Sequence, residues 1–169
     1  YNAGSYAYNY LQEITTISAG SKHAAVITKN GDLFTWGNGE NGQLGNGAND
    51  DSNLPVKAFE NAVQVASGSN QSIAIQKDSA VWAWGDNTSG QLGVEINNET
   101  TEDGTAIEDS RSLPVEVDLT DGVDFTEITD IAAGKNHTVI VLNNDTVYTW
   151  GDNTYGQLGT GENGSYIPN

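Results

Sequence analysis

The segment WGDNTSGQLG, residues 84–93, returns as WGDNTYGQLG at residues 150–159, with Tyr155 in place of Ser89. A looser third copy, WGNGENGQLG, occupies residues 36–45. Copies of one motif along a chain indicate an architecture built from repeats of one structural unit. The repeated segment is therefore either a site or a piece of scaffold that every unit needs.

Three landmarks in each copy keep a common spacing. They lie 48 residues apart between the first two copies and 66 apart between the second and third. The landmarks are Gly20, Gly68 and Gly134; Trp36, Trp84 and Trp150; and Leu44, Leu92 and Leu158. The longer interval contains residues 94–111, VEINNETTEDGTAIEDSR, an acidic stretch with no apolar period. It predicts a solvated loop insertion.

Each copy predicts three short strands separated by polar turns. In the first copy these are an alternating apolar run at 14–19, a β-prone run at 24–28 and an aromatic-x-Trp-Gly strand at 34–37. Short strands between Gly, Asn and Asp turns are typical of antiparallel sheets. A fourth, outer strand is predicted at 54–57 and 113–117, because Pro is tolerated at a sheet edge. Four strands per unit predict an all-β chain of about three propeller blades.

The repeats also divide the chain. Repeat 1 covers residues 14–60, repeat 2 covers 61–127 with the acidic insertion 94–111, and repeat 3 covers 128–169. Repeat 3 is expected to be truncated where its outer strand begins. The N-terminal segment, 1–13, is a candidate outer strand.

The order of the motifs is an alternating apolar run, Gly-x-x-His, a polar turn, aromatic-x-Trp-Gly and Gly-Gln-Leu-Gly. This pattern resembles the repeats of the RCC1 (regulator of chromosome condensation) family over residues 14–168. The middle copy departs from the pattern, with Gln71 where the others have His23 and His137. The resemblance implies a β-propeller of four-stranded blades, seven in the familiar members. Three blades do not close such a ring. We therefore expect a fragment of a larger propeller, or self-association that covers the open blade edges.

The repeated turn is interpreted as scaffold. A Gly directly after the Trp permits the sharp turn that ends the strand. The Leu is predicted to lie in the core between blades, and Gln43, Gln91 and Gln157 to hydrogen-bond the backbone of the turn. The alternative is a calcium site on the oxygen-rich residues 86–88. Against it, the first copy has Asn38 in place of the Asp.

Nothing in the sequence indicates catalysis. No Ser/His/Asp order, HExxH helix or phosphate-binding loop is present. His23, Gln71 and His137 occupy one place in their units, so a group that hydrogen-bonds across the turn suffices there. The paired aromatics are predicted to pack between blades rather than to stack on bases or sugars. We expect no enzymatic activity, no cofactor and no metal.

Charge and composition limit the partners. The chain has 23 acidic and 6 basic side chains, a net charge of −17, which disfavours nucleic acid and anionic lipid. The sequence has no run of 18 apolar residues, so no insertion into a membrane is predicted. The acidic composition, without Cys or Met, favours a secreted or cell-surface protein, with a cytoplasmic location as the alternative.

These observations predict a protein–protein interaction module, part of a larger secreted or cell-surface protein with adhesive or inhibitory binding. Contacts are expected where the repeats differ. The candidate residues are Asn41, Ser89, Tyr155, Glu102, Asp103, Glu108 and Asp109. The alternatives are a structural spacer of stacked blades, a carbohydrate-binding module and, implied by the resemblance, a regulator similar to small-GTPase exchange factors.

Overall fold

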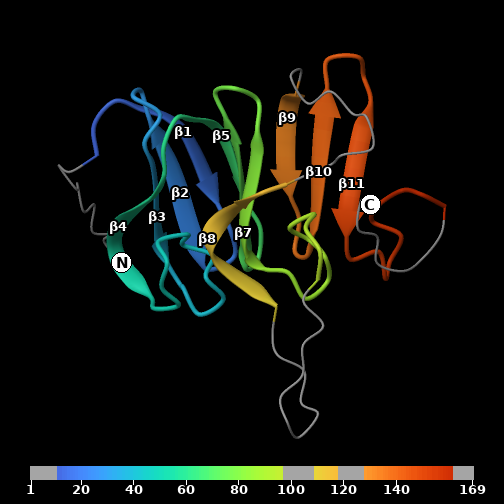
Figure 1. Ribbon diagram of the computed structural model, residues 1–169, viewed down its shortest axis with the longest axis horizontal. Helices are drawn as coiled ribbons and strands as arrows, with labels where there is room; N and C mark the ends of the chain where they lie inside the picture. The colour runs from blue at the N-terminus through green and yellow to red at the C-terminus, as the bar shows by residue number, and fades with distance from the viewer. Residues whose placement is uncertain (1–10, 97–108, 118–127, 162–169) are drawn as a thin grey trace, which may run out of the picture.

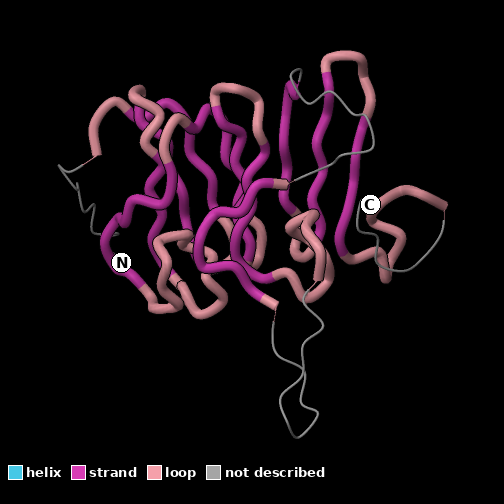
Figure 2. The backbone as a smooth tube through the Cα atoms, in the orientation of Figure 1, coloured by secondary structure: helices cyan, strands magenta, loops and turns pink. Residues whose placement is uncertain are grey.

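The structure, a computed structural model, describes residues 11–96, 109–117 and 128–161. These residues form three antiparallel sheets that stand side by side as successive blades (Figure 1). Strands and connecting loops account for all of the described chain, with no helix among them (Figure 2). The predicted all-β fold class is confirmed.

Each blade follows chain order from its inner strand outward. Blade 1 consists of β1 (Ile14–Ala19), β2 (His23–Thr28), β3 (Leu33–Gly37) and β4 (Ser52–Phe59). Blade 2 consists of β5 (Ala62–Ser67), β6 (Gln71–Gln76), β7 (Val81–Asp86) and β8 (Ser110–Glu116). Blade 3, as described, consists of β9 (Ile128–Ala133), β10 (His137–Leu142) and β11 (Val147–Gly151).

The strand register repeats from blade to blade. His23 of β2 pairs with Gly37, Gln71 of β6 with Gly85, and His137 of β10 with Gly151. These pairs keep the spacings of 48 and 66 residues that the sequence shows. Because the register is constant, a residue can be compared directly with its equivalents in the other blades.

Gly85 shows why a glycine follows the Trp. Its φ is +103°, and a Cβ there would lie 2.2 Å from the carbonyl oxygen of Asn70. A side chain is thus excluded both by backbone conformation and by the close approach of the neighbouring strand. The equivalent glycines Gly37 and Gly151 end their strands as predicted, whereas β7 continues one residue past Gly85, to Asp86.

The core lies between the blades rather than within each one. One apolar cluster includes Ile27 and Leu33 of blade 1 with Val65 and Trp84 of blade 2. A second cluster joins blades 2 and 3, and Leu92 belongs to it. Leu44 and Leu158 are also buried. The predicted burial of the repeated Leu is confirmed.

Some predicted boundaries need correction. The middle strands begin one residue earlier than expected, at His23, Gln71 and His137. The insertion 94–111 is not loop throughout, because Ser110 and Arg111 already belong to β8 and pair with β7. The N-terminal segment 1–10, insertion residues 97–108 and the C-terminal residues 162–169 lie outside the described residues.

Candidate functional site

The glutamine of the repeated turn fixes the turn through its side chain. In each copy its Oε1 accepts a hydrogen bond from the backbone N–H two residues earlier. The three bonds are Asn41 to Gln43 at 2.9 Å, Ser89 to Gln91 at 2.8 Å and Tyr155 to Gln157 at 2.9 Å. The prediction that glutamine holds the turn is confirmed, and the three turns share one geometry.

The backbone carbonyl of the same glutamine joins neighbouring blades, a role that sequence reasoning missed. Gln43 O accepts the indole N–H of Trp84 at 2.9 Å and the hydroxyl of Ser72 at 3.0 Å. The same pair of bonds recurs at Gln91 O, from Trp150 at 3.0 Å and from Thr138 at 2.8 Å. The constant spacing between the Trp and the Gln indicates that the two residues have a shared role. A single sequence does not show that the Trp of one unit bonds the Gln of a neighbouring unit.

The histidine position also connects blades. The expected bond across the turn occurs at Gln71, whose Oε1 accepts the N–H of Asn70 at 3.3 Å, whereas His23 Nε2 lies 2.9 Å from Ser72 Oγ in blade 2. Burial lowers the pKa of the His23 imidazole to about 4. In the middle copy Gln71 Nε2 donates to the carbonyl of Gly134 in blade 3, at 3.0 Å. A neutral hydrogen-bonding group is therefore sufficient at this position.

The three variable turn residues occupy equivalent places but differ in exposure. The loops after β3, β7 and β11 lie at one end of the blades, the lower end in Figure 1. Asn41 and Ser89 are partly buried. Tyr155 has 91% of its surface exposed and is the most exposed large apolar side chain of the described residues. The repeated frame thus presents an aromatic side chain to solvent at one position.

Asp109 lies inside blade 2. Its carboxylate accepts a hydrogen bond from Asn87 Nδ2 at 2.9 Å and pairs with Arg111. Its backbone carbonyl accepts the N–H of Asn87 at 2.7 Å. The structure therefore separates buried Asp109 from exposed Tyr155. Glu102, Asp103 and Glu108 lie outside the described residues.

The oxygen-rich turns bind their own backbone. Asp86 accepts the N–H of Thr88, and Asp152 accepts both the N–H and the hydroxyl of Thr154. These bonds, the hydroxyl first, lower the pKa of the Asp152 carboxyl. Within the described ranges no group of three or more His, Asp or Glu side chains is placed to hold a metal. The same residues contain no helix with the length and apolar character needed to span a bilayer.

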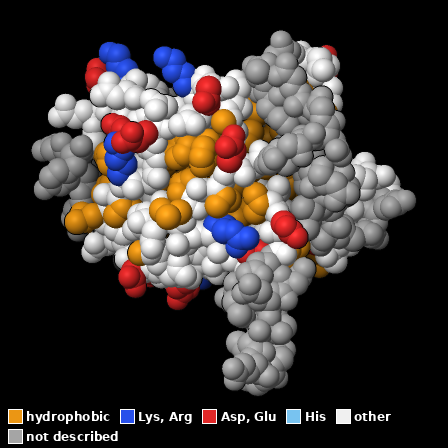
Figure 3. Space-filling model, in the orientation of Figure 1, with side chains coloured by type: hydrophobic (Ala, Val, Ile, Leu, Met, Phe, Trp, Pro, Cys, Tyr) orange, Lys and Arg blue, Asp and Glu red, His pale blue; other side chains and the backbone are white. Residues whose placement is uncertain are grey.

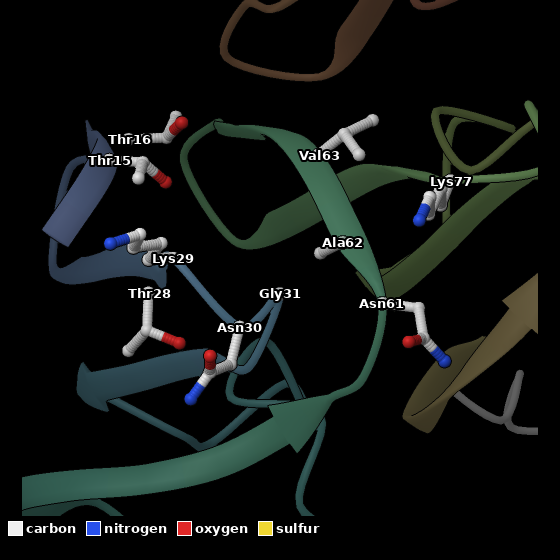
Figure 4. Close-up of a pocket in the computed structure, with 10 residues that line it drawn as sticks. All are labelled: Thr15, Thr16, Thr28, Lys29, Asn30, Gly31, Asn61, Ala62, Val63 and Lys77. Atoms are coloured by element: carbon white, nitrogen blue, oxygen red, sulfur yellow. The ribbon is translucent and has the colours of Figure 1, made fainter. Parts of the chain in front are cut away.

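A cavity of about 410 Å³ opens between blades 1 and 2, beside the turn after β2. Lys29 and Lys77 lie on opposite sides of it (Figure 4). Lys29 pairs with Glu13 at 3.1 Å, whereas the equivalent of Glu13 in blade 2 is Asn61, so that Lys77 lacks this carboxylate. The cavity offers cationic and amide donors, which suit an anionic group. It is lined by the ends of β1, β2 and β5 and by turn residues, and none of its polar side chains is buried in a way that would define a site.

An apolar patch lies on the outer face. Figure 3 shows hydrophobic side chains gathered where β8 crosses the molecule. Leu54 of β4 and Leu113 of β8 are both exposed, and each precedes the Pro of its outer strand. Single exposed apolar residues are normal on protein surfaces. Leu54 and Leu113, however, occupy equivalent positions on neighbouring blades, and they form an exposed apolar surface that sequence reasoning did not identify.

Four-stranded antiparallel blades, joined side by side through buried indole-to-carbonyl bonds, define a β-propeller repeat protein. Models of the regulator of chromosome condensation (RCC1) repeat match residues 30–75 and 78–141, and a second model of this repeat matches 14–43, 62–91 and 128–157. The chain therefore belongs to the RCC1 repeat family.

Sequence relatives agree with this assignment. The ultraviolet-B receptor UVR8 of Arabidopsis thaliana is 33% identical over 151 residues, which cover 88% of this chain and 32% of the relative. The human E3 ubiquitin-protein ligase HERC2 is 32% identical over 149 residues, covering 88% of this chain and 3% of the relative. The chain spans a third or less of the length of these proteins.

Solved structures show the same fold. Prp20p of Saccharomyces cerevisiae superposes with a TM-score of 0.73 at 22% identity, covering 92% of this chain and 37% of the other. Human WBSCR16 gives a TM-score of 0.72, also at 22% identity and with the same coverage. The structure of Prp20p was described together with its binding to Gsp1p and histones.

Proposed function

We propose that the chain is a protein-binding module whose contacts are made where the repeats differ. The observation that carries this proposal is the contrast within one turn. The Gln side chain and the buried Leu keep the turn in one conformation, while the position two residues before the Gln changes from Asn41 to Ser89 to an exposed Tyr155. A rigid frame with variable exposed side chains is how repeat proteins bind partners.

The net charge of −17 adds a preference for a partner with a basic surface. Opposite charges steer association and raise its rate, an effect that salt screens. The relative Prp20p, which binds histones, supports a protein partner of this kind. Binding is therefore expected to weaken as ionic strength rises.

The experiment is affinity capture with the full chain, followed by measurement of the dissociation constant for each captured protein. Tyr155→Ala is expected to weaken binding at least about tenfold, since aromatic residues supply much of the energy at protein interfaces. Val63→Ala, at an exposed apolar residue of β5 outside this turn, is the matched control and should leave binding unchanged. Binding that tolerates Tyr155→Ala would contradict the proposed surface.

The acidic insertion is tested separately. A deletion limited to residues 97–108 spares Asp109 and Arg111, whose contacts lie within blade 2. If the acidic residues steer a basic partner, the deletion lowers the association rate more than it raises the dissociation rate. An unchanged association rate would remove the insertion from the binding surface.

Other functions have distinct signatures. A structural spacer of stacked blades captures no partner in the affinity experiment. A carbohydrate-binding module is favoured by exposed Tyr155 and would bind a glycan array in a way that Tyr155→Ala abolishes. A regulator similar to small-GTPase exchange factors, suggested by the family, would accelerate nucleotide release from a captured GTPase.

A secreted or cell-surface location, with an adhesive or inhibitory role, is part of the same proposal. Its support is the acidic composition without cysteine or methionine. Fractionation of the tagged native protein between cells and medium tests it. Recovery from the cytoplasm alone would replace it with the cytoplasmic alternative.

A further inference from the structure

A second cavity lies at the end of the blades that carries the variable turns. Its volume is about 430 Å³, and it is lined by three equivalent segments, 19–21, 67–69 and 133–135. These segments are the ends of the inner strands β1, β5 and β9 and the turns that follow them. Because His23 at the start of β2 pairs with Gly37 at the end of β3, these turns lie at the same end as the loops after β3, β7 and β11.

The three turns pack directly on one another. The backbone N–H of Ser21 donates to the carbonyl of Gly68 at 3.1 Å, and that of Ser69 donates to the carbonyl of Lys135 at 3.3 Å. A Cβ on Gly20 would collide with the carbonyl oxygen of Gly68. The wall of the cavity is therefore backbone that is held in place by hydrogen bonds between blades.

Ser67 supplies a buried polar group to this wall. It is 8% exposed, and its backbone N–H donates to Ser18 Oγ of blade 1 at 2.9 Å. Its hydroxyl has no hydrogen-bond partner among the described residues. Burying a hydroxyl without a partner is unfavourable, and the repeat does not require one here, because the equivalents of Ser67 are Ala19 and Ala133. The Ser67 hydroxyl is thus a donor particular to blade 2.

Two further donors belong to the same cavity. Ser69 Oγ donates to Ser21 Oγ at 3.0 Å, which uses one of the two hydroxyl hydrogens of this pair, and no described residue accepts the other. Lys135 occupies the equivalent position in blade 3. It is exposed and forms no ion pair with the part of the chain that the structure describes. The cavity therefore offers hydroxyl donors beside one ammonium group.

The charge of these turns is opposite to that of the chain. The chain has 23 acidic and 6 basic side chains, whereas the three turns contain two lysines, Lys22 and Lys135, and no Asp or Glu over residues 18–23, 66–71 and 132–137. Asp152, whose backbone N–H donates to the third turn, uses its carboxylate to bind Thr154. At about 0.15 M salt, repulsion from more distant acids is screened beyond about 8 Å. The groups of the cavity therefore dominate the field that a ligand meets there.

We propose that this cavity binds an oxyanion, which is a phosphate or carboxylate group. The hydroxyls of Ser67 and of the Ser21–Ser69 pair donate to its oxygens, and the Lys135 ammonium balances its charge. Hydrogen bonds to an ionised acceptor are stronger than those between neutral groups. The oxyanion is either a free ion or a group of the protein that contacts Tyr155 at the same end, and this second source rests on the proposed function.

A titration of the ¹⁵N-labelled 169-residue chain with inorganic phosphate tests the site, with ionic strength held at about 0.15 M by chloride. The backbone amide signals of Ser21, Gly68, Ser69 and Lys135 are expected to shift and to saturate. Acetate is the second probe and should shift the same signals. Shifts that rise without saturation, or that centre on Lys29 and Lys77 instead, would overturn the proposal.

Two substitutions remove donors and copy the equivalent residues of other blades, so that each variant is expected to fold. Ser67→Ala should weaken phosphate binding at least about tenfold, because it removes a buried hydrogen bond to an ionised acceptor. Lys135→Ser should weaken it about threefold to fivefold, since an exposed charge contributes less. Circular dichroism and urea unfolding check that both variants keep the parent's fold and stability.

Lys77→Asn is the matched control for charge. It copies Asn143, its equivalent in blade 3, and removes a lysine at the opposite end of the blades. The dissociation constant for phosphate, measured on the signals of Ser21 and Ser69, should not change. If Ser67→Ala binds phosphate as the parent does, the cavity is not the site and the proposal fails.

The two sources of the oxyanion are distinguished with a protein captured through the Tyr155 surface. Loss of affinity for that protein in Ser67→Ala shows that the partner carries the oxyanion. Unchanged affinity, together with loss of phosphate binding, shows that the ligand is a free ion. No partner protein enters the phosphate titration, so its outcome is independent of the proposed function.

Discussion

The indole nitrogen of Trp150 lies 3.0 Å from the backbone carbonyl oxygen of Gln91 in the preceding blade, and both groups are buried. Trp84 and Gln43 form the same contact one blade earlier. Each copy of the repeated motif can therefore take part in two contacts between blades. Its Trp donates to the blade before it, and its Gln accepts from the blade after it. Blades are joined by a specific polar bond as well as by apolar packing.

Trp150→Phe is expected to lower the free energy of unfolding by about 2 to 4 kcal/mol. The change removes a buried hydrogen bond and leaves space where the larger ring was. Trp36→Phe is the matched control and should cost less than about 1 kcal/mol, because its indole has no such bond to the described residues. Urea denaturation of both variants measures the difference. Equal losses would contradict the role of the indole bond.

The fold could be predicted from the sequence because the spacing of the repeats can be read from it directly. The constant spacing of Trp, Leu and Gly predicts the blades, and the predicted places of Leu92, Gln91 and Gly85 are those observed. Strand ends were less certain, since the β-propensity of a residue such as His23 does not say whether it pairs. Contacts between blades were missed because equivalent positions in a repeat do not show whether a bond stays within one unit.

The candidate site was only partly predictable. The exposure of Tyr155 follows from its place in a turn that the Gln side chain holds. Asp109 was grouped with the other acids of the insertion by charge alone. Its burial depends on Asn87, 22 residues earlier, and on Arg111, which lies where β8 begins to pair with β7. A single sequence does not reveal that partnership.

Gly93→Ala and Gly159→Ala separate steric contact from backbone strain. Both glycines have nearly the same positive φ, +74° and +70°, so the conformational cost of Ala is common to both. Only Gly93 faces an indole, and its substitution is expected to cost about 1 to 3 kcal/mol more than that of Gly159. Thermal and urea unfolding of the two variants measure the difference. Similar losses would show that the indole moves aside.

His23 makes stability depend on pH. Its folded pKa of about 4 lies below the usual value of 6.5, so the unfolded chain binds the proton more strongly. The stability contributed by neutral His23 is complete above pH 6.5 and is lost as pH falls toward 4, by up to about 3 kcal/mol. His23→Gln, which copies Gln71, should flatten the stability profile between pH 4 and 6.5. Urea unfolding across this range checks it, and an unchanged slope would contradict the assignment.

Asp109→Ala is expected to destabilise blade 2 by about 1 to 3 kcal/mol, because the buried amide of Asn87 and the guanidinium of Arg111 lose their acceptor. Asp109→Asn keeps one acceptor oxygen and should recover part of this loss. Glu95→Ala, at an exposed acidic residue of the same connection, is the control for charge and should change stability by less than about 0.5 kcal/mol. Unfolding by urea gives the three values. If Asp109→Ala weakens partner binding while stability is unchanged, Asp109 acts at the binding surface instead of within the blade.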